Sequence, residues 1–577
     1  MYLSVCFVVS KSNYMKLFYF VLPVITGTVI ITKMIFVTKS YHKIVLDIKY
    51  YYGLTLVHNS LSHRTCDFKV QILLFIWILM NLAHNLETSA SFFPDRPAIR
   101  EGSIIMTYGK LNDQANRIAT GLIKMGVKPG EHVGLCAPNS AEWIAFYFGV
   151  LKAGAVAVTL SSQLRREELA IFIEHAKPRF LYTTEVRLND LKPLQDSGFL
   201  EQTICPGGDL DLPQLAGMGS DIFKAIARGR KSTAAVLYTG GTTGISKGVM
   251  LTHEGINFSS GMVAHFERSL ETDVALCFMP FNHVFGQIHI MNATIFSAGC
   301  LELLPSFDLE RILELTESGR VTKFYSVPTV YIRLLTIGDL KRKLGKVRYC
   351  FSAAASMATE IVKQWREQTG ITISESYGLT EVMPVTYNHY YPEKHVVGSV
   401  GQAVHGVEIQ IRDTSGNLLK EGEKGEICVR GPVVMKGYLN NPEGTKDAFW
   451  GRDWLRTGDI GRQDANGYLY IVDRLKELII TGGENVYPGE VEEALYTKPE
   501  VQECAVVGLP DREWGEKVAA FIIPKPGQTI LPDDVKSFLK TKLSPFKVPK
   551  EYIVVEDMPK SPAGKILKRE LGKMFSP

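Results

Sequence analysis

Segments with helical spacing of apolar residues alternate with short apolar runs along most of this chain, from residue 95 onward. Residues 108–125 show the helical spacing, and residues 132–135 and 155–160 form apolar runs of strand length. Strands that are joined through helices run parallel, because the helix carries the chain back to the starting edge of the sheet. The alternation predicts an α/β fold with a large N-terminal domain of mostly parallel sheets flanked by helices.

The pattern changes after residue 398. Strand-like segments at 408–412 and 425–430 are separated by turns rich in glycine, aspartate and asparagine, which predicts a small β-barrel-like antiparallel subdomain. Beyond residue 473, about 100 residues carry helix and strand patterns of their own, a length that suits a small α+β domain. We place the boundary at the charged segment 473–476, so that residues 80–473 form the large domain and residues 474–577 a small, mobile one.

The net charge of the chain bears on its binding partners, and the number and spacing of its cysteines bear on its compartment. Lysine and arginine exceed aspartate and glutamate by 64 to 60, and residues 1–84 carry eight of these basic and two of these acidic side chains. The remaining residues sum to −2, which is unlike a nucleic-acid-binding protein. The nine cysteines form no C-x-x-C pair and no zinc-ligand spacing, and their odd number fits a reducing compartment. We expect a cytoplasmic protein with no nucleic-acid partner.

Residues 1–79 form a hydrophobic, basic extension. Uncharged runs at 17–32 and 70–86 suggest membrane association through residues 17–37 or 70–83, although the first run is short for a spanning helix. Basic residues before an apolar run also resemble a signal peptide, but no clear cleavage site follows. The alternative is that translation begins at Met80 and that the mature protein lacks the extension. The chain ends in Phe-Ser-Pro, not in a Ser-Lys-Leu peroxisomal signal.

A loop rich in glycine and threonine, at 238–248, is the strongest chemical signal. Its glycines let backbone amides approach an anion, its hydroxyls offer donors, and its lysine adds a positive charge, so it suits a polyphosphate. The candidate ligands are Thr239, Gly240, Gly241, Thr242, Thr243, Gly244 and Lys247. The loop is not a Walker A motif. Residues 244–248 match the G-x-S-x-G nucleophile elbow, so a serine hydrolase is an alternative, although the upstream glycines and threonines have no role in one.

Four further motifs follow the loop in order: Ser-Tyr-Gly-Leu-Thr-Glu at 376–381, Arg-Thr-Gly-Asp at 456–459, Asp-Arg-Leu-Lys at 473–476 and Pro-Ala-Gly-Lys at 562–565. With the loop, they resemble the acyl-adenylate-forming (AMP-binding) ligase superfamily over residues 85–577. The resemblance is closest to its acyl-CoA synthetase branch, which includes fatty acid, coumarate and luciferase-type enzymes. It implies an adenylation domain at 80–473 and a mobile C-terminal AMP-binding domain at 474–577.

The resemblance implies a nucleotide site. The loop would wrap the β- and γ-phosphates of ATP, and Glu381 would bind the Mg²⁺ that bridges them. Other segments would hold the adenosine: Tyr377 and Gly378 would lie at the adenine, and Asp459 and Arg474 would bind the ribose. The family's Gly-Gly-Ala-Pro segment beside adenine reads Ser-Ala-Ala-Ala-Ser here, and Ser352 and Ala354 are its candidate contacts. An Asp–Arg pair such as 459 and 474 is also a common structural ion pair.

The resemblance also implies the catalytic residues. Lys565 would pair with the substrate carboxylate and offset charge at the α-phosphate, where Thr380 would donate a hydrogen bond. His283 matches a family position beside the carboxylate, although an isolated histidine could equally be a core residue. For thioester formation the small domain would turn about the hinge residue Lys476, and Gly482 and Gly483 would line the pantetheine tunnel.

The expected function is ATP-dependent ligation of a carboxylic acid, in particular a medium- or long-chain fatty acid, to coenzyme A, with release of AMP and pyrophosphate. Segments 283–290, 325–330, 352–357 and 382–385 would build an acyl pocket that is mostly apolar or small. Two alternatives stay open: an adenylating enzyme that loads a carrier protein, and a non-catalytic nucleotide-binding scaffold. The sequence motifs do not specify the acyl chain length, a preference for aliphatic or aromatic acids, or the oligomeric state.

Overall fold

The computed structural model describes residues 80–239, 246–391, 393–561 and 564–575, together with four short N-terminal strands. The chain divides into two units, Met1–Trp77 and Ile78–Pro577. In the first unit the described strands form two antiparallel hairpins: β1 (Tyr2–Val5) with β2 (Phe20–Pro23), and β3 (Met34–Val37) with β4 (Lys43–Leu46). The remainder of the predicted membrane segment 17–37 lies outside the described residues.

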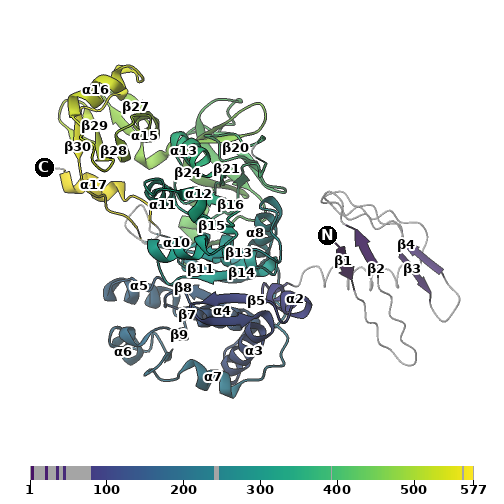
Figure 1. Ribbon diagram of the computed structural model, residues 1–577. Helices are drawn as coiled ribbons and strands as arrows, with labels where there is room; N and C mark the ends of the chain where they lie inside the picture. Colours follow the sequence, from purple (N-terminus) through teal and green to yellow (C-terminus); the bar gives the residue numbers. More distant parts are fainter. Residues whose placement is uncertain are drawn as a thin grey trace. The chain divides into compact units, whose positions relative to one another are not determined.

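Two seven-stranded sheets build the large domain (Figure 1). The first has the order β10-β9-β7-β8-β11-β12-β22; β10 to β11 in this order are parallel, and β12 is antiparallel to both its neighbours. Its strands are β7 (His132–Leu135), β8 (Val156–Thr159), β9 (Phe180–Tyr182), β10 (Gln202–Ile204), β11 (Thr233–Thr239), β12 (Lys247–Thr252) and β22 (Gly437–Tyr438).

The second sheet has the order β17-β16-β15-β13-β14-β5-β6, and only β6 runs antiparallel in it. Its strands are β5 (Pro97–Glu101), β6 (Ile104–Thr107), β13 (Val274–Cys277), β14 (Cys300–Leu303), β15 (Lys323–Ser326), β16 (Tyr349–Ser352) and β17 (Ile373–Glu375). The helices that connect and flank the two sheets include α2 (His84–Phe92), α3 (Tyr108–Lys124), α4 (Ala141–Lys152), α5 (Arg166–Ala176), α8 (His253–Phe266), α10 (Leu309–Glu317), α11 (Pro328–Leu334) and α13 (Thr359–Thr369). The predicted mostly parallel α/β architecture is confirmed.

Helix α4 illustrates why these residues fold as they do. The Ser140 hydroxyl caps its start by accepting a hydrogen bond from the Trp143 amide, at 3.1 Å. Every residue of the helix except Glu142 is buried. A helix that is apolar on all sides belongs inside a large core, and α4 supplies six consecutive buried apolar residues to it, 143–148.

The β-rich segment after residue 398 forms a five-stranded antiparallel sheet. Its strands are β20 (Glu408–Arg412), β21 (Gly425–Arg430), β23 (Phe449–Trp450), β24 (Trp454–Gln463) and β25 (Leu469–Arg474). The first two have the same bounds as the strand-like segments of the sequence, because alternating side chains and glycine turns are local signals.

The small C-terminal domain has a sheet and a core of its own (Figure 1). Its order is β27-β26-β29-β28, with β30 paired to β29. The elements are β26 (Ile479–Thr481), β27 (Glu484–Val486), α15 (Pro488–Tyr496), β28 (Val501–Asp511), β29 (Gly515–Pro524), α16 (Pro532–Lys540), β30 (Glu551–Val554) and α17 (Lys568–Phe575). The predicted domain boundary falls at the end of β25, directly before the short 3₁₀ helix η3 (Leu475–Glu477).

The end of the second apolar run, at 81–83, is part of the large-domain core. Leu82 and Ala83 are fully buried, and the Asn81 side chain donates to the carbonyls of Leu151 and Ile226. These three residues therefore contact protein instead of lipid, and residues 70–79 lie outside the described residues. Among the residues that the structure describes, no helix combines the length and the apolarity needed to cross a bilayer.

Candidate active site

The phosphate-loop candidates lie on a β-hairpin. Thr239 at the end of β11 pairs with Lys247 at the start of β12, so the intervening residues connect two antiparallel strands. Gly240, Gly241, Thr242, Thr243 and Gly244 lie outside the described residues, and their phosphate role stays a prediction.

This hairpin argues against the serine hydrolase alternative. A nucleophile elbow places its serine on a turn between a strand and a helix. Here the residue after Ser246 begins strand β12, so the required turn geometry is absent.

Lys247 and Glu381 both contact the side chain of Tyr438. The Lys247 ammonium lies 4.6 Å from the centre of the Tyr438 ring, and the Tyr438 hydroxyl donates to Glu381 Oε1 at 2.9 Å. The backbone of Glu381 is held by the Met435 amide, 2.7 Å from its carbonyl oxygen. The predicted metal ligand thus lies beside the predicted phosphate loop, on segments that β12 and β22 bring together.

The residues around Glu381 suit a magnesium ion that is held mainly by substrate phosphates. Within the described residues, no group of three or more His, Cys, Asp or Glu side chains is arranged to hold a metal. Mg²⁺ in nucleotide sites commonly takes one or two carboxylates and completes its shell with phosphates and water. A single carboxylate near the loop fits that coordination.

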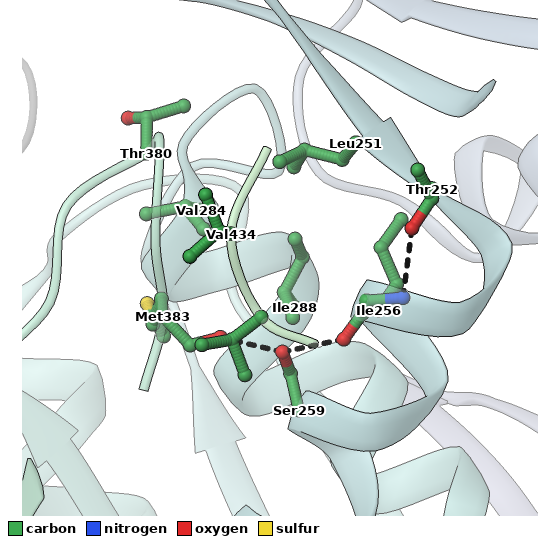
Figure 2. A pocket seen from close by; sticks show the side chains of 11 residues that line it. Leu251, Thr252, Ile256, Ser259, Val284, Ile288, Thr380, Met383 and Val434 are labelled. Carbon is green, nitrogen blue, oxygen red and sulfur yellow. Dashed lines mark hydrogen bonds between the residues drawn. The ribbon is translucent and has the colours of Figure 1, made fainter. Parts of the chain in front are cut away.

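Thr380 shares a small cavity with the residue next to His283. Figure 2 shows Thr380, Val284 and Ile288 in its lining, opposite Ser259 of α8. Val284 follows His283 directly in the sequence, but His283 itself is not among the residues that line this cavity.

Tyr377, Asp459 and Arg474 form a connected group. The Tyr377 hydroxyl donates to Asp459 Oδ2 at 2.6 Å, and Arg474 Nε lies 3.3 Å from Asp459 Oδ1. Asp459 of β24 and Arg474 of β25 are cross-strand partners. Burial raises the pKa of Asp459, and Arg474 opposes that effect. Each carboxylate oxygen has a second lone pair, so Asp459 can still accept from a ribose hydroxyl.

Lys565 lies on a tight turn of the small domain. The Ser561 amide donates to the Lys565 carbonyl at 2.8 Å, and the Lys565 amide lies 3.2 Å from the Ser561 hydroxyl. Gly564 has φ +81°, a left-handed conformation that glycine adopts without strain. Its carbonyl accepts from the Thr329 hydroxyl of the large domain at 3.1 Å, while Pro562 and Ala563 lie outside the described residues.

The turn brings Lys565 among charged groups of the hinge. Burial, together with the nearby Arg474, lowers the pKa of Lys565 to about 8, and Glu477 and Asp459 oppose this change. Burial, together with the charge of Lys565, lowers the pKa of His283 to about 4. At pH 7 the lysine is therefore mostly charged and the histidine neutral.

The hydrogen bonding of His283 suggests its tautomer. The Phe285 amide donates to His283 Nδ1 at 3.2 Å, so Nδ1 is an acceptor and the proton resides on Nε2. A neutral imidazole with an Nε2–H group can donate to a carboxylate.

Ser352 and Ala354 follow strand β16. Ser352 is buried and pairs in register with Glu375 of β17. Ala354 has φ +70°, a left-handed conformation that is rare for alanine. Gly378 is closely packed, because a Cβ there would lie 3.0 Å from the Val382 carbonyl oxygen.

Lys476, Gly482 and Gly483 belong to the hinge and the first hairpin of the small domain. Lys476 lies in η3, and burial, with Arg474, lowers its pKa. Gly482 and Gly483 form the two-residue turn between β26 and β27, with φ +59° and +84°. A Cβ on Gly482 would lie 2.7 Å from the Trp514 ring. The turn therefore explains both glycines structurally, and their pantetheine role stays a prediction.

A buried charged cluster adjoins the predicted acyl segments and was not anticipated. Glu267 pairs with Lys323 at 3.0 Å and bonds to His289 at 2.8 Å, Tyr325 at 2.5 Å and Tyr387 at 2.9 Å. Burial alone would raise the pKa of Glu267, but Lys323 and the hydrogen bonds lower it to about 2. These residues are far apart in the sequence, so no local sequence pattern predicts the cluster.

Two family models match the chain. The model described as AMP-binding enzyme matches residues 86–439, and the model described as AMP-binding enzyme C-terminal domain matches residues 490–565. Together they cover more than half of the chain. The chain belongs to the AMP-binding enzyme family.

Similar proteins place the chain within this family. It is 33% identical over 522 residues to the long-chain-fatty-acid–CoA ligase of Bacillus subtilis (strain 168), covering 84% of this chain and 93% of the relative. It is also 33% identical to the feruloyl-CoA synthase of an Amycolatopsis species, with 84% and 97% covered. The ATP-bound MatB structure from Rhodopseudomonas palustris aligns with a TM-score of 0.80 at 34% identity, covering 86% of this chain and 99% of that one.

These matches confirm the recognised superfamily and its acyl-CoA ligase branch, an acid–thiol ligase class for which ATP and coenzyme A are fitting co-substrates. They do not agree on one acid. The similar proteins include a long-chain-fatty-acid–CoA ligase, a feruloyl-CoA synthase and an oxalate–CoA ligase.

Proposed function

We propose that this protein is an ATP-dependent ligase that activates a medium- or long-chain fatty acid as an acyl-adenylate and transfers the acyl group to coenzyme A. The observation that carries the proposal is the convergence of Lys565, His283, Asp459 and Arg474. Burial lowers the pKa values of Lys565 and His283, the nearby Arg474 lowers that of Lys565 further, and the charge of Lys565 lowers that of His283 further. The fatty acid is supported by the similarity to the Bacillus long-chain-fatty-acid–CoA ligase.

In the first half-reaction, a carboxylate oxygen attacks the α-phosphorus of ATP. The new C–O–P bond forms as the bond from the α-phosphorus to the bridging oxygen breaks, and pyrophosphate leaves. Lys565 would lower the repulsion between the two anions, His283 would orient the carboxylate through Nε2–H, and Thr380 would donate to the α-phosphate. Glu381 would hold Mg²⁺, which supplies charge neutralisation at the leaving phosphates.

Adenosine recognition would use the segments that follow β16, β17 and β24. Tyr377 and Gly378 would lie at the base with Ser352 and Ala354, and Asp459 and Arg474 would bind the ribose hydroxyls. The loop at 239–247 would hold the β- and γ-phosphates.

In the second half-reaction, the thiol of coenzyme A gives up its proton to solvent and its sulfur bonds to the acyl carbon. The bond from that carbon to the phosphate oxygen breaks, and AMP leaves. A cavity of about 270 Å³ is lined in part by the turn that carries Lys565, so it belongs to the arrangement for adenylation and would lose that wall when the small domain turns. It borders Asn282, beside His283, and Gly564, beside Lys565, and its lining includes the cations Arg333 and Lys560, which suit phosphate groups. Lys476 would act in the hinge and Gly482 and Gly483 in the pantetheine tunnel.

Pyrophosphate release from the full-length protein, measured with ATP, Mg²⁺, coenzyme A and carboxylic acids of graded chain length, tests the proposal. Acids of eight to eighteen carbons should support release, while cinnamic and dicarboxylic acids serve as comparison. Accumulation of adenylate without thioester would favour the carrier-protein alternative. Absence of pyrophosphate release with every acid would favour the scaffold. A protein beginning at Met80 tests whether residues 1–79, for which membrane association stays a prediction, matter for activity.

A further inference from the structure

Helix α13 of the large domain receives its N-terminal cap from the small domain. The residue at its N-cap position is Ala358, whose methyl group offers no acceptor for the first amides of the helix. The Thr359 amide instead lies 3.1 Å from Glu493 Oε1 and 3.3 Å from Oε2. Glu493 belongs to α15, so its carboxylate spans the two domains and also faces the positive end of the α13 dipole.

A second contact from the same helix reinforces this one. Glu490, one turn earlier on α15, pairs with Lys424 of the large domain at 2.6 Å. The Thr329 hydroxyl adds a bond to the Gly564 carbonyl, next to Lys565. These contacts exist in the arrangement that brings the charge of Lys565 to Asp459 and His283.

Helix α13 is also joined to the predicted adenine site. It begins directly after the segment 352–357, which contains the left-handed Ala354. Glu375 lies in register with Ser352, and its carboxyl group is buried. The charge of Glu493 contributes to the raised pKa of this carboxyl group. The cap therefore links the small domain to the segment expected beside the nucleotide.

We propose that Glu493 is a positioning residue for the first half-reaction: by capping α13 across the domain interface, it stabilises the arrangement in which Lys565 faces the nucleotide site. The proposal rests on the proposed function for its catalytic consequence. When the small domain turns for thioester formation, α13 loses this cap, so the contact favours adenylation alone.

The test compares Glu493→Ala with Glu570→Gln in the full-length protein. Glu570 is a suitable control because it is an exposed carboxylate of the small domain, paired with Lys573 on α17. Loss of an N-cap contact is expected to lower the ratio of the adenylation rate to the thioester-forming rate by about fivefold. Adenylation is measured by pyrophosphate exchange. Thioester formation is measured separately, from supplied acyl-adenylate, and its rate should stay within about twofold of wild type in both variants.

Hydrogen exchange gives a readout that needs no substrate. The amides of residues 359–361 should exchange faster in Glu493→Ala and at the wild-type rate in Glu570→Gln. This result is independent of ligase activity, so a failure of the proposed function leaves the contact testable. Unchanged exchange in Glu493→Ala would overturn the proposal.

A third variant separates positioning from helix stability. Adding Ala358→Ser to Glu493→Ala supplies a local cap for the amides of residues 360 and 361, so exchange at these two amides should slow again while adenylation stays low. Recovery of both would mean that Glu493 merely stabilises α13, and an equal loss of both half-reactions in Glu493→Ala would mean a general structural defect. Either result would overturn the proposal.

Discussion

At the residue scale, the candidate catalytic residues Lys565 and His283 differ in charge at neutral pH. The pKa values of both Lys565 and His283 are lowered, chiefly by burial, but they start from different ordinary values. At neutral pH this leaves one cation and one neutral donor beside the expected carboxylate. A second cation there would have to be desolvated next to Lys565, at a cost that the neutral histidine avoids.

The lowered pKa of Lys565 predicts an alkaline limit for adenylation. Lys565 is protonated below about pH 8 and loses its charge above it, so kcat/KM for pyrophosphate exchange should fall as the pH rises through 8. Lys565→Arg, which keeps its charge, should be less active but should lack this limb. A limb that is unchanged in Lys565→Arg would assign the titration to another group.

Glu375 predicts a decline of stability with rising pH. Burial, with the charge of Glu493, raises its pKa from 4.5 to about 8 in the folded protein. Between these values the folded state binds the extra proton, so stability is full below about pH 4.5 and is lost as the pH rises through 8. Glu375→Gln should remove this loss and raise Tm by about 2–4 °C at pH 9, with little change at pH 5. Equal shifts at both pH values would contradict this account.

At the element scale, the unusual backbone conformations near the site lie in turns, and proline occupies the first turn of a helix there. The turn after β16 places alanine in a left-handed conformation, whereas the β26–β27 turn uses two glycines for the same region of backbone space. Helix α15 begins at Pro488, because proline suits the first turn, where no backbone donor is needed.

Ala354→Gly should stabilise the protein. Glycine removes the strain of a left-handed alanine, which costs about 1–2 kcal/mol, but it also gives the unfolded chain more conformational freedom. The free energy of unfolding should therefore rise by about 0.5–1 kcal/mol. Ala355→Gly is the matched control, since φ at Ala355 is not left-handed and only the entropic loss applies. Urea unfolding of both variants measures the difference, and a loss of stability in Ala354→Gly would show that the conformation carries little strain.

At the scale of the whole molecule, the site exists only where the small domain meets the large one. Lys565 belongs to the small domain's C-terminal segment, while His283, Thr380 and Asp459 belong to the large domain. A domain turn would therefore remove one candidate catalytic group, Lys565, and leave the candidate nucleotide residues of the large domain in place.

Lys565→Ala should separate the two half-reactions. Adenylation should fall by about 10²–10³-fold, because a charge that acts at the transition state is lost. Thioester formation from supplied acyl-adenylate should remain near the wild-type rate. Lys573→Ala, at an exposed lysine of α17, is the control and should change neither step. An equal loss of both steps in Lys565→Ala would contradict the domain turn.

Sequence patterns alone determined the mostly parallel α/β architecture, strands such as His132–Leu135 and Glu408–Arg412 to the residue, and the order of the nucleotide motifs. These features depend on side-chain periodicity and turn chemistry, which neighbouring residues carry. Only the tertiary structure decided that residues 81–83 join the core, that Glu267 lies in a buried cluster and that Glu493 caps α13. Burial, pKa and interdomain contact depend on segments that are distant along the chain, and their approach is a property of the packed molecule.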